Sequence, residues 1–310
     1  MKIRRRAGAL ACAALLAHAS ALAQSDPAAD APEEGERALE RALARQSIFV
    51  VPAGAYELEP GFEYTYRATD ALEIVNQAGV AQVARQDVKQ DRLETRLTFR
   101  LGLPHSSHVE IRVPYVLLRS DRSTADQFGQ TVHETGFGDL QLGFTKQLVE
   151  DSPGRPGLLA TANWRMPTGD FRLGEPSPGS GYHVLQGALT LVKRQDPLVF
   201  FGTASYSSVR ERRHSGSEID PGDPVGLKFG AMLAASPQTS VRGGFEVSRA
   251  GRTKINGSAI PGSDTTVATL QFGLATLLSK RSLLDIQLGI GVTPDTPNFA
   301  LTVSAPIRFQ

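Results

Sequence analysis

The chain has 310 residues, 33 lysines and arginines against 32 aspartates and glutamates, and a formal net charge of +1. This balance predicts no nucleic-acid partner, because nucleic-acid-binding surfaces are strongly basic. The only cysteine, Cys12, lies in the N-terminal segment, so the chain beyond it can form neither a disulfide nor a thiolate metal site.

The N-terminus carries the three features of a secretory signal peptide. Basic residues between positions 2 and 6 precede an apolar run from Ala7 to Ala17, and Ala21-Leu22-Ala23 follows before Gln24. A basic start, a short apolar core and a small-x-small end define such a signal. We predict a signal peptide over residues 1–23, cut after Ala23. The apolar run is short for a membrane-spanning helix, so an N-terminal anchor is the weaker alternative.

Residues 24–50 are predicted to form a periplasmic leader with one short helix at 32–46. Pro32 suits the first turn of this helix, and the acidic residues after it and the arginines near its end match the helix dipole. Its apolar stripe is too thin to stabilise so short a helix in isolation. Three interpretations remain open: a plug inside a barrel, a short periplasmic coiled coil, and a frayed or disordered leader.

Beyond residue 50 the sequence shows the two-residue period of β-strands and no helix-period segment. In the stretch 136–146, for example, Leu140, Leu142 and Phe144 fall on one face, and polar residues and glycine fall on the other. Twelve such segments are predicted, at about 54–67, 90–102, 108–119, 136–146, 157–168, 183–193, 198–210, 225–235, 241–250, 266–278, 283–293 and 299–309.

The connections between these segments alternate in length, as they do in outer-membrane β-barrels. The long ones are predicted at about 68–88, 120–135, 169–182, 211–224 and 251–264. We therefore predict an all-β fold: a 12-stranded antiparallel transmembrane β-barrel over residues 51–310, with a short N-terminal helix. Loops 120–135 and 169–182 are expected to fold over or into the mouth. A large soluble β-sandwich is the alternative.

The polar face of the predicted strands carries a balanced set of charges. The candidates for lining the lumen are Arg92, Glu94, Arg96, Arg100, Glu110, Arg112, Asp139, Arg165, Arg242 and Glu246. The arginines at 92, 96 and 100 face neighbouring strands that carry Glu57, Glu59, Glu63 and Glu110. We expect much of this row to form structural ion pairs rather than a ladder that guides substrate, and we do not predict strong ion selectivity.

Few residues suggest a metal site or a catalytic site. His105 and His108 stand three apart in a predicted turn, but no third ligand accompanies them. We interpret both as solvated turn histidines and predict no metal site. A lipid hydrolase at the outer rim would need a serine beside a histidine, and Ser180 and His183 in a glycine-rich loop are the nearest match. We predict neither an enzyme nor a cofactor.

Several short motifs occur in an order that resembles a known family. They are Pro52–Pro60, Tyr64–Tyr66, Val109–Tyr115, Gly136–Leu140, Pro167–Asp170, Gly181–Tyr182 and Asp196–Pro197. Together they resemble the bacterial outer-membrane family of meta-pathway phenol-degradation proteins, also catalogued as transporters. The resemblance implies a 12-stranded barrel and uptake of aromatic or other hydrophobic compounds. More distantly, the chain is similar to the export channel for functional amyloid, whose plug helix and long coiled coil are matched at most by residues 32–46.

We therefore predict an outer-membrane channel for passive passage of a small solute, with hydrophobic and aromatic compounds as candidates. The alternatives are a plugged secretion conduit for a small unfolded polypeptide, a structural barrel, and an outer-membrane lipid enzyme. The expected partners are outer-membrane lipid, the solute, and the barrel-insertion machinery, for which the near-terminal Phe309 is a signal.

Overall fold

The computed structural model describes residues 50–77, 80–124, 127–172, 176–214, 216–236, 238–279 and 281–309. Within these ranges the regular structure consists of strands. No helix of the length and apolarity that a membrane crossing requires lies in this part of the chain. The predicted signal peptide, its cleavage site and the predicted helix at 32–46 lie outside the described residues.

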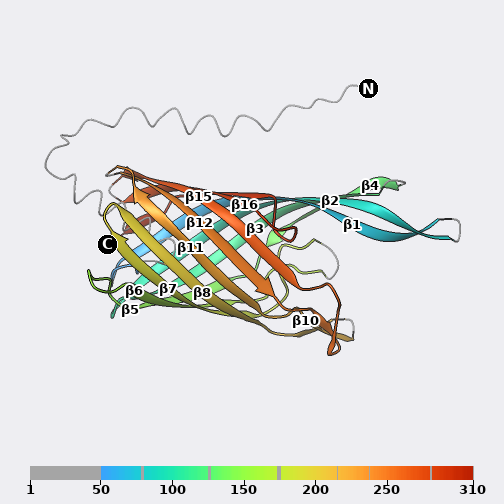
Figure 1. Cartoon of the computed structure of the whole chain (residues 1–310), viewed down its shortest axis with the longest axis horizontal. Helices are drawn as coiled ribbons and strands as arrows, with labels where there is room; N and C mark the ends of the chain where they lie inside the picture. Colours follow the sequence, from blue (N-terminus) through green and yellow to red (C-terminus); the bar gives the residue numbers. More distant parts are fainter. Residues whose placement is uncertain are drawn as a thin grey trace, which may run out of the picture.

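The main sheet is antiparallel and follows chain order around a closed wall (Figure 1). Its first half comprises β1 (Tyr56–Gln77), β2 (Val80–Leu103), β3 (Ser107–Thr124), β4 (Gln127–Phe137), β5 (Gln141–Val149), β6 (Gly157–Arg165) and β7 (Val184–Gln195). Its second half comprises β8 (Leu198–Val209), β11 (Pro224–Ala234), β12 (Thr239–Ala250), β15 (Thr265–Ser279), β16 (Ser282–Gly291), β17 (Phe299–Ser304) and β18 (Ile307–Phe309).

These fourteen segments make twelve wall strands. β4 and β5 pair in succession with β3, and β17 and β18 pair in succession with β1, so each couple is one strand with a break. β1 closes the wall, since it pairs with β2 on one side and with β17 and β18 on the other. Closure leaves no unpaired sheet edge, which is the condition for a sheet to span lipid. The predicted 12-stranded barrel is confirmed.

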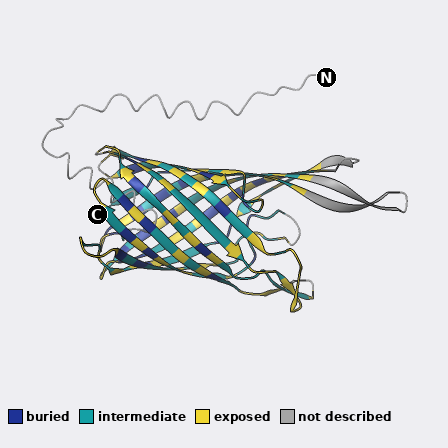
Figure 2. Cartoon of the chain, viewed as in Figure 1, coloured by how far each residue is buried: buried dark blue, intermediate teal, exposed yellow. Residues whose placement is uncertain are grey.

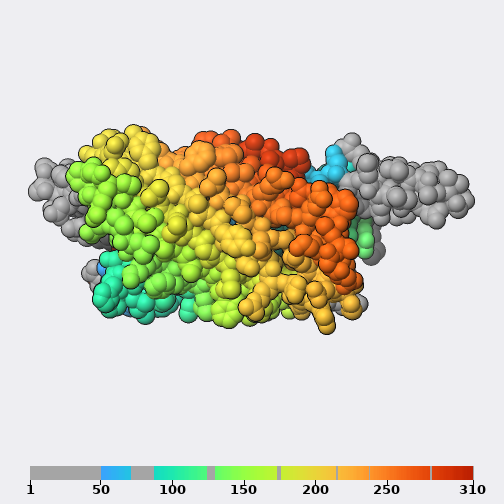
Figure 3. All heavy atoms as spheres, turned by 60° about the horizontal axis from the view of Figure 1, so that its bottom comes forward, coloured from blue at the N-terminus to red at the C-terminus, as the bar shows by residue number. Residues whose placement is uncertain are grey.

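The outer face of the wall is apolar and the inner face is largely polar. Along β7, Leu185, Leu189 and Leu191 point outward and are about half exposed, with Leu189 at 52%. Their neighbours Gln186 and Thr190 take the opposite parity and line an interior cavity. Figure 2 shows the resulting alternation of exposure along the strands. In the space-filling view the side chains of the green-to-orange strands close the wall surface (Figure 3). Such an exposed apolar band matches a lipid-facing surface.

Aromatic side chains mark both ends of the predicted crossing on the outer face. At the short-turn end, Tyr56 stacks on Phe309 with ring centroids 5.0 Å apart. Ten residues further along β1, the ring of Tyr66 lies 5.9 Å from that of Phe299. Aromatic girdles at both membrane interfaces are typical of outer-membrane barrels. The spacing along β1 matches the 9–11 residues, roughly, that a tilted strand needs to cross.

The prediction of loops at 68–88 and 120–135 is wrong in one respect, because most of these residues are in strands. β1 and β2 contain 22 and 24 residues, and β3 pairs with β4 up to Thr124 and Gln127. Figure 1 shows β1, β2 and β4 running beyond the other strands at the long-loop end. Segment 120–135 therefore continues the wall and does not fold into the mouth. The alternation of apolar and polar residues in the sequence is weak there, because both faces of a strand outside the membrane meet water.

A second sheet joins two of the predicted long loops, 211–224 and 251–264. It contains β9 (Arg212–His214), β10 (Ser217–Asp220), β13 (Lys254–Ile255) and β14 (Ser258–Ala259). Asp220 accepts a hydrogen bond from the Gly222 N–H and pairs with Lys254 at 3.1 Å, and in this order these contacts lower the pKa of its carboxyl. Pairing across the loops stiffens this part of the rim.

The lipid-facing assignment predicts a face-dependent effect of added charge. Leu189→Arg places a cation at the middle of the outer face and is expected to destabilise the barrel by about 2–4 kcal/mol. Ser205→Arg adds the same charge to the inner face and is expected to cost less. Urea unfolding of the refolded proteins in lipid vesicles compares the two, and equal losses would contradict the assignment.

Candidate functional site in the barrel interior

An apolar cluster fills one side of the interior at the short-turn end, and we call it the apolar floor. It is formed by the inward side chains near the turns of six strands: Leu159, Val192, Val199, Phe201, Met232, Ala275 and Leu283. All are buried, and Val199 is 0% exposed. Val50, which precedes β1, packs against the floor. Sequence reasoning missed this cluster, although the weak alternation in the segments at 183–193 and 198–210 was a signal for it.

A buried charge cluster occupies the opposite wall at the same end, and we call it the Arg100 cluster. Arg100 Nη1 donates to Glu57 Oε1 at 2.8 Å and to Glu59 Oε2 at 2.7 Å, and Arg100 Nε donates to Glu110 Oε2 at 2.6 Å. Arg308 adds a second cation, 3.2 Å from Glu57. Buried carboxylates need such partners, because an unpaired charge in a low-dielectric interior is strongly destabilising.

The segment before β1 docks between these two clusters. Gly54 N–H donates to the Gly102 carbonyl at 3.1 Å, and Gly102 N–H donates to the Ala55 carbonyl at 2.8 Å. A Cβ on residue 102 would lie 1.8 Å from the Pro52 carbonyl oxygen, so this approach requires glycine. Val51 is buried, and its N–H faces His108 Nδ1 at 3.4 Å.

The interpretation of His108 as a solvated turn histidine is wrong. His105 is exposed in the turn, whereas His108 is 3% exposed and takes the inward parity of β3. The pairing of β2 with β3 sets Gly102 opposite His108, which leaves space for Val51 beside the imidazole. Within the described residues no group of three His, Cys, Asp or Glu side chains could hold a metal ion.

The other predicted lumen residues form ion pairs along the wall. Arg96 pairs with Glu63 at 2.9 Å, as its position suggested, but Arg92 pairs with Glu94 on its own strand. Arg112 pairs with Glu110 at 3.0 Å. Glu246 lies 3.6 Å from Lys228 and accepts a hydrogen bond from Gln271. These contacts account for most of the balanced interior charge.

Arg242 reaches across a whole strand to its partner. Its two terminal nitrogens bind the two carboxylate oxygens of Asp285 at 2.7 and 2.8 Å, and one also donates to Gln287. The guanidinium passes over Gly273 of the intervening β15, where a Cβ would lie 2.3 Å from Arg242 Nε. Glycine is therefore required at 273 for this bidentate pair to form.

Asp139 does not project freely into the lumen but anchors the loop between β6 and β7. Its carboxylate accepts hydrogen bonds from the Gly169 N–H and from the Ser180 N–H and hydroxyl. Leu140 N–H donates to Thr168 Oγ1 at 2.9 Å. The motifs Gly136–Leu140 and Pro167–Asp170 thus bind each other. Asp139 was predicted from its inward parity, but its partners are distant in sequence.

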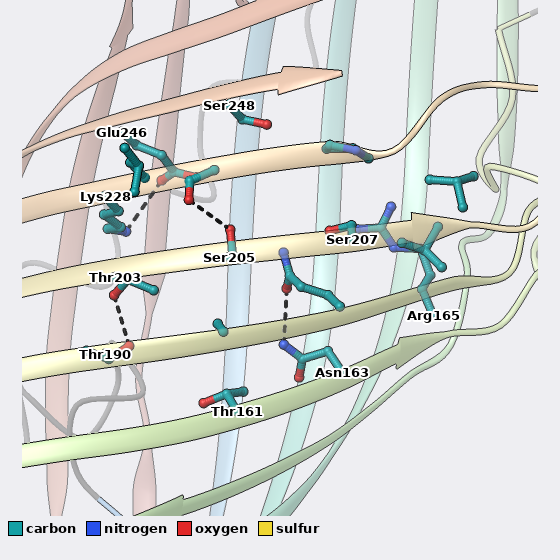
Figure 4. Close-up of a pocket in the computed structure, with 17 residues that line it drawn as sticks. Thr161, Asn163, Arg165, Thr190, Thr203, Ser205, Ser207, Lys228, Glu246 and Ser248 are labelled. Carbon is teal, nitrogen blue, oxygen red and sulfur yellow. Dashed lines mark hydrogen bonds and ion pairs between the residues drawn. The ribbon is translucent and has the colours of Figure 1, made fainter. Parts of the chain in front are cut away.

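A cavity of about 420 Å³ lies above the apolar floor, and we call it the central cavity. Figure 4 shows that strands β6, β7, β8, β11 and β12 contribute its lining. Eight of the 17 lining residues carry hydroxyl or amide groups: Thr161, Asn163, Gln186, Thr190, Thr203, Ser205, Ser207 and Ser248. Arg165 lies at the end of the cavity near the long loops, and the Lys228–Glu246 pair lies deeper (Figure 4). The volume falls in the range of small-molecule sites, roughly 300–1,000 Å³.

Ser180 and His183 have separate partners. The Ser180 hydroxyl donates to Asp139. His183 stacks on Trp164 of the outer face and accepts a hydrogen bond from the indole N–H at 3.4 Å. Among the described residues Ser180 and His183 therefore do not form the serine–imidazole hydrogen bond that a lipid hydrolase requires.

The closed strand circuit, apolar outside and polar inside, defines an outer-membrane β-barrel. A model of the family described as "Putative MetA-pathway of phenol degradation" matches residues 95–309. The match spans more than half of the chain, and the protein belongs to this family.

Solved structures with a similar fold include an outer membrane channel from Pseudomonas putida F1. That channel is 18% identical with a TM-score of 0.64, and the alignment covers 84% of this chain and 97% of the channel. The translocator domain of autotransporter NalP from Neisseria meningitidis is 11% identical with a TM-score of 0.46, over 90% and 95% of the two chains. The CymD monoaromatic hydrocarbon channel is 11% identical with a TM-score of 0.42, over 88% and 93%.

The Arg100 cluster predicts a large stability effect from a single substitution. Arg100→Gln leaves Glu57, Glu59 and Glu110 buried around a neutral amide and is expected to cost about 3–5 kcal/mol. Arg92→Gln is the matched control, because its partly exposed pair with Glu94 is expected to contribute about 1 kcal/mol or less. Urea unfolding in lipid vesicles measures both, and similar losses would refute a special role for Arg100.

Proposed function

We propose that this protein is an outer-membrane channel through which a small solute crosses without energy input. The observation that carries the proposal is the central cavity, a polar chamber inside a wall whose outer face is apolar. Hydroxyl and amide groups around the cavity offer a passing solute replacements for its hydration. The family description, which refers to phenol degradation, supports a small aromatic compound as the solute.

Passage through the short-turn end requires movement of the segment that lies there. The apolar floor and the Arg100 cluster occupy facing parts of the interior. Val50 packs against the floor, and the Val51 N–H faces His108. In this proposal, residues 50–55 act as the gate between the central cavity and the periplasm. The proposal also includes export by the signal peptide, assembly by the barrel-insertion machinery and no catalytic activity.

Blocking the central cavity is expected to lower conductance. Ser205→Trp fills the cavity from β8, whereas Leu189→Trp places the same ring on the lipid face of the adjacent β7, outside the cavity lining. Single-channel recording of the refolded mature protein in planar bilayers should show steady openings that Ser205→Trp reduces severalfold and Leu189→Trp does not. If the wild-type protein gives no openings, the channel proposal fails and a structural barrel takes its place.

The position of Val50 and Val51 also favours a second candidate, a plugged secretion conduit. In that case the leader would be a displaceable plug, and deletion of residues 24–46 would raise conductance sharply. A diffusion channel predicts openings of similar size in the full mature chain and in the deletion variant. The same bilayer recordings distinguish the two, and openings confined to the deletion variant would favour the conduit.

A further inference from the structure

Arg165 differs from most inward cations of the wall in its lack of a carboxylate partner among the described residues. Seven inward cations of the wall have a carboxylate within 4.0 Å: Arg92, Arg96, Arg100, Arg112, Lys228, Arg242 and Arg308. Within the described ranges of the chain, Arg165 has neither an ion pair nor a side-chain hydrogen bond. It ends β6 and lines the central cavity. The central cavity therefore presents one uncommitted positive charge.

Nearby carboxylates at the rim have other partners. Asp139 accepts hydrogen bonds from the loop that follows β6, at Gly169 and Ser180. Asp223 accepts from the Tyr206 hydroxyl and from the Val209 N–H. Lys228 and Glu246, at the deeper end of the cavity, neutralise each other. An anion that enters the cavity meets no lining carboxylate beside Arg165.

Apolar residues neighbour Arg165 on the adjacent strands and share the cavity lining with it. The strand register places Arg165 opposite Val184 on β7, and Val184 opposite Val209 on β8. Pro224 begins β11 and lines the same cavity. Figure 4 shows Ser207 at this end of the cavity together with Arg165. The site thus combines one cation, a hydroxyl and a small apolar surface.

This combination selects for a particular solute chemistry. A guanidinium binds a carboxylate through two parallel N–H···O bonds, which gives geometric specificity as well as attraction. A single cation balances a monoanion, and the valines and proline suit an apolar body. We infer that Arg165, Ser207, Val184 and Val209 form a binding site for a small monocarboxylate with an aromatic or other apolar body. This inference rests on the proposed channel function and specifies its solute class.

Titration calorimetry of the refolded mature protein in detergent micelles tests the site. The probes are benzoate and benzamide, which have similar shape but differ in charge. Benzoate is expected to bind at least about tenfold more tightly than benzamide, because only the carboxylate forms charge-assisted hydrogen bonds with Arg165. Arg165→Gln should abolish this difference. Arg165→Lys keeps the charge but loses the planar donor pair. Its preference for benzoate over benzamide should therefore lie between those of the wild-type protein and Arg165→Gln.

Arg249→Gln is the matched control. It removes the same charge from β12 at a position that is outward and does not line the cavity. Its preference for benzoate should equal that of the wild-type protein. The inference is overturned if wild-type protein binds benzoate no better than benzamide, or if Arg165→Gln retains the preference.

Bilayer conductance of the same preparations separates this inference from the channel proposal. Conductance without a benzoate preference contradicts the monocarboxylate site alone. A benzoate preference that depends on Arg165, without conductance, contradicts the channel alone.

Discussion

The structure depends on one constraint: in lipid, each backbone N–H and C=O must find its partner within the protein. Antiparallel pairing from β1 through β16 satisfies this along the wall, and the pairing of β1 with β17 and β18 satisfies it at the seam. Closure then divides the side chains into two sets. The outward set meets lipid and is apolar, while the inward set shares a confined interior, where every charge needs a partner or water.

Pairing of the inward charges shapes the interior as much as the fold does. The Arg100 cluster and the Arg242–Asp285 pair each hold several strands together. The Arg242–Asp285 pair needs glycine at position 273, because a Cβ there would meet Arg242. With the apolar floor opposite the Arg100 cluster, the short-turn end is packed like a protein core. The central cavity lies above this packed end, and at its outer side Arg165 has no carboxylate partner in the part of the chain that the structure describes. The central cavity and Arg165 are thus what remains of the interior after these pairs are made.

Segments outside the regular strands are attached to the wall at both ends of the barrel. At the long-loop end, Asp139 fixes the loop after β6 to the break between β4 and β5, and a small sheet joins two other loops. At the short-turn end, the Val51 segment lies on Gly102 and beside His108. Both attachments use few hydrogen bonds, in contrast to the continuous ladders of the wall. Movement that opens a path is therefore expected at these attachments before it occurs in the wall.

The sequence by itself determined the strand count, the parity of each strand and the closed barrel, because a two-residue period repeated in chain order depends only on local geometry. It also indicated the pairing of Arg96 and Arg100 with glutamates, since these lie on adjacent strands. Only the tertiary structure decided which inward residues meet across strands that are not adjacent. Leu159 joins Leu283 in the floor, Asp139 meets Ser180, and His108 is buried. Arg165 has no ion pair with any residue that the structure describes. The tilt and stagger of the strands determine the height at which each inward residue lies in the barrel. Both arise only when the whole wall closes.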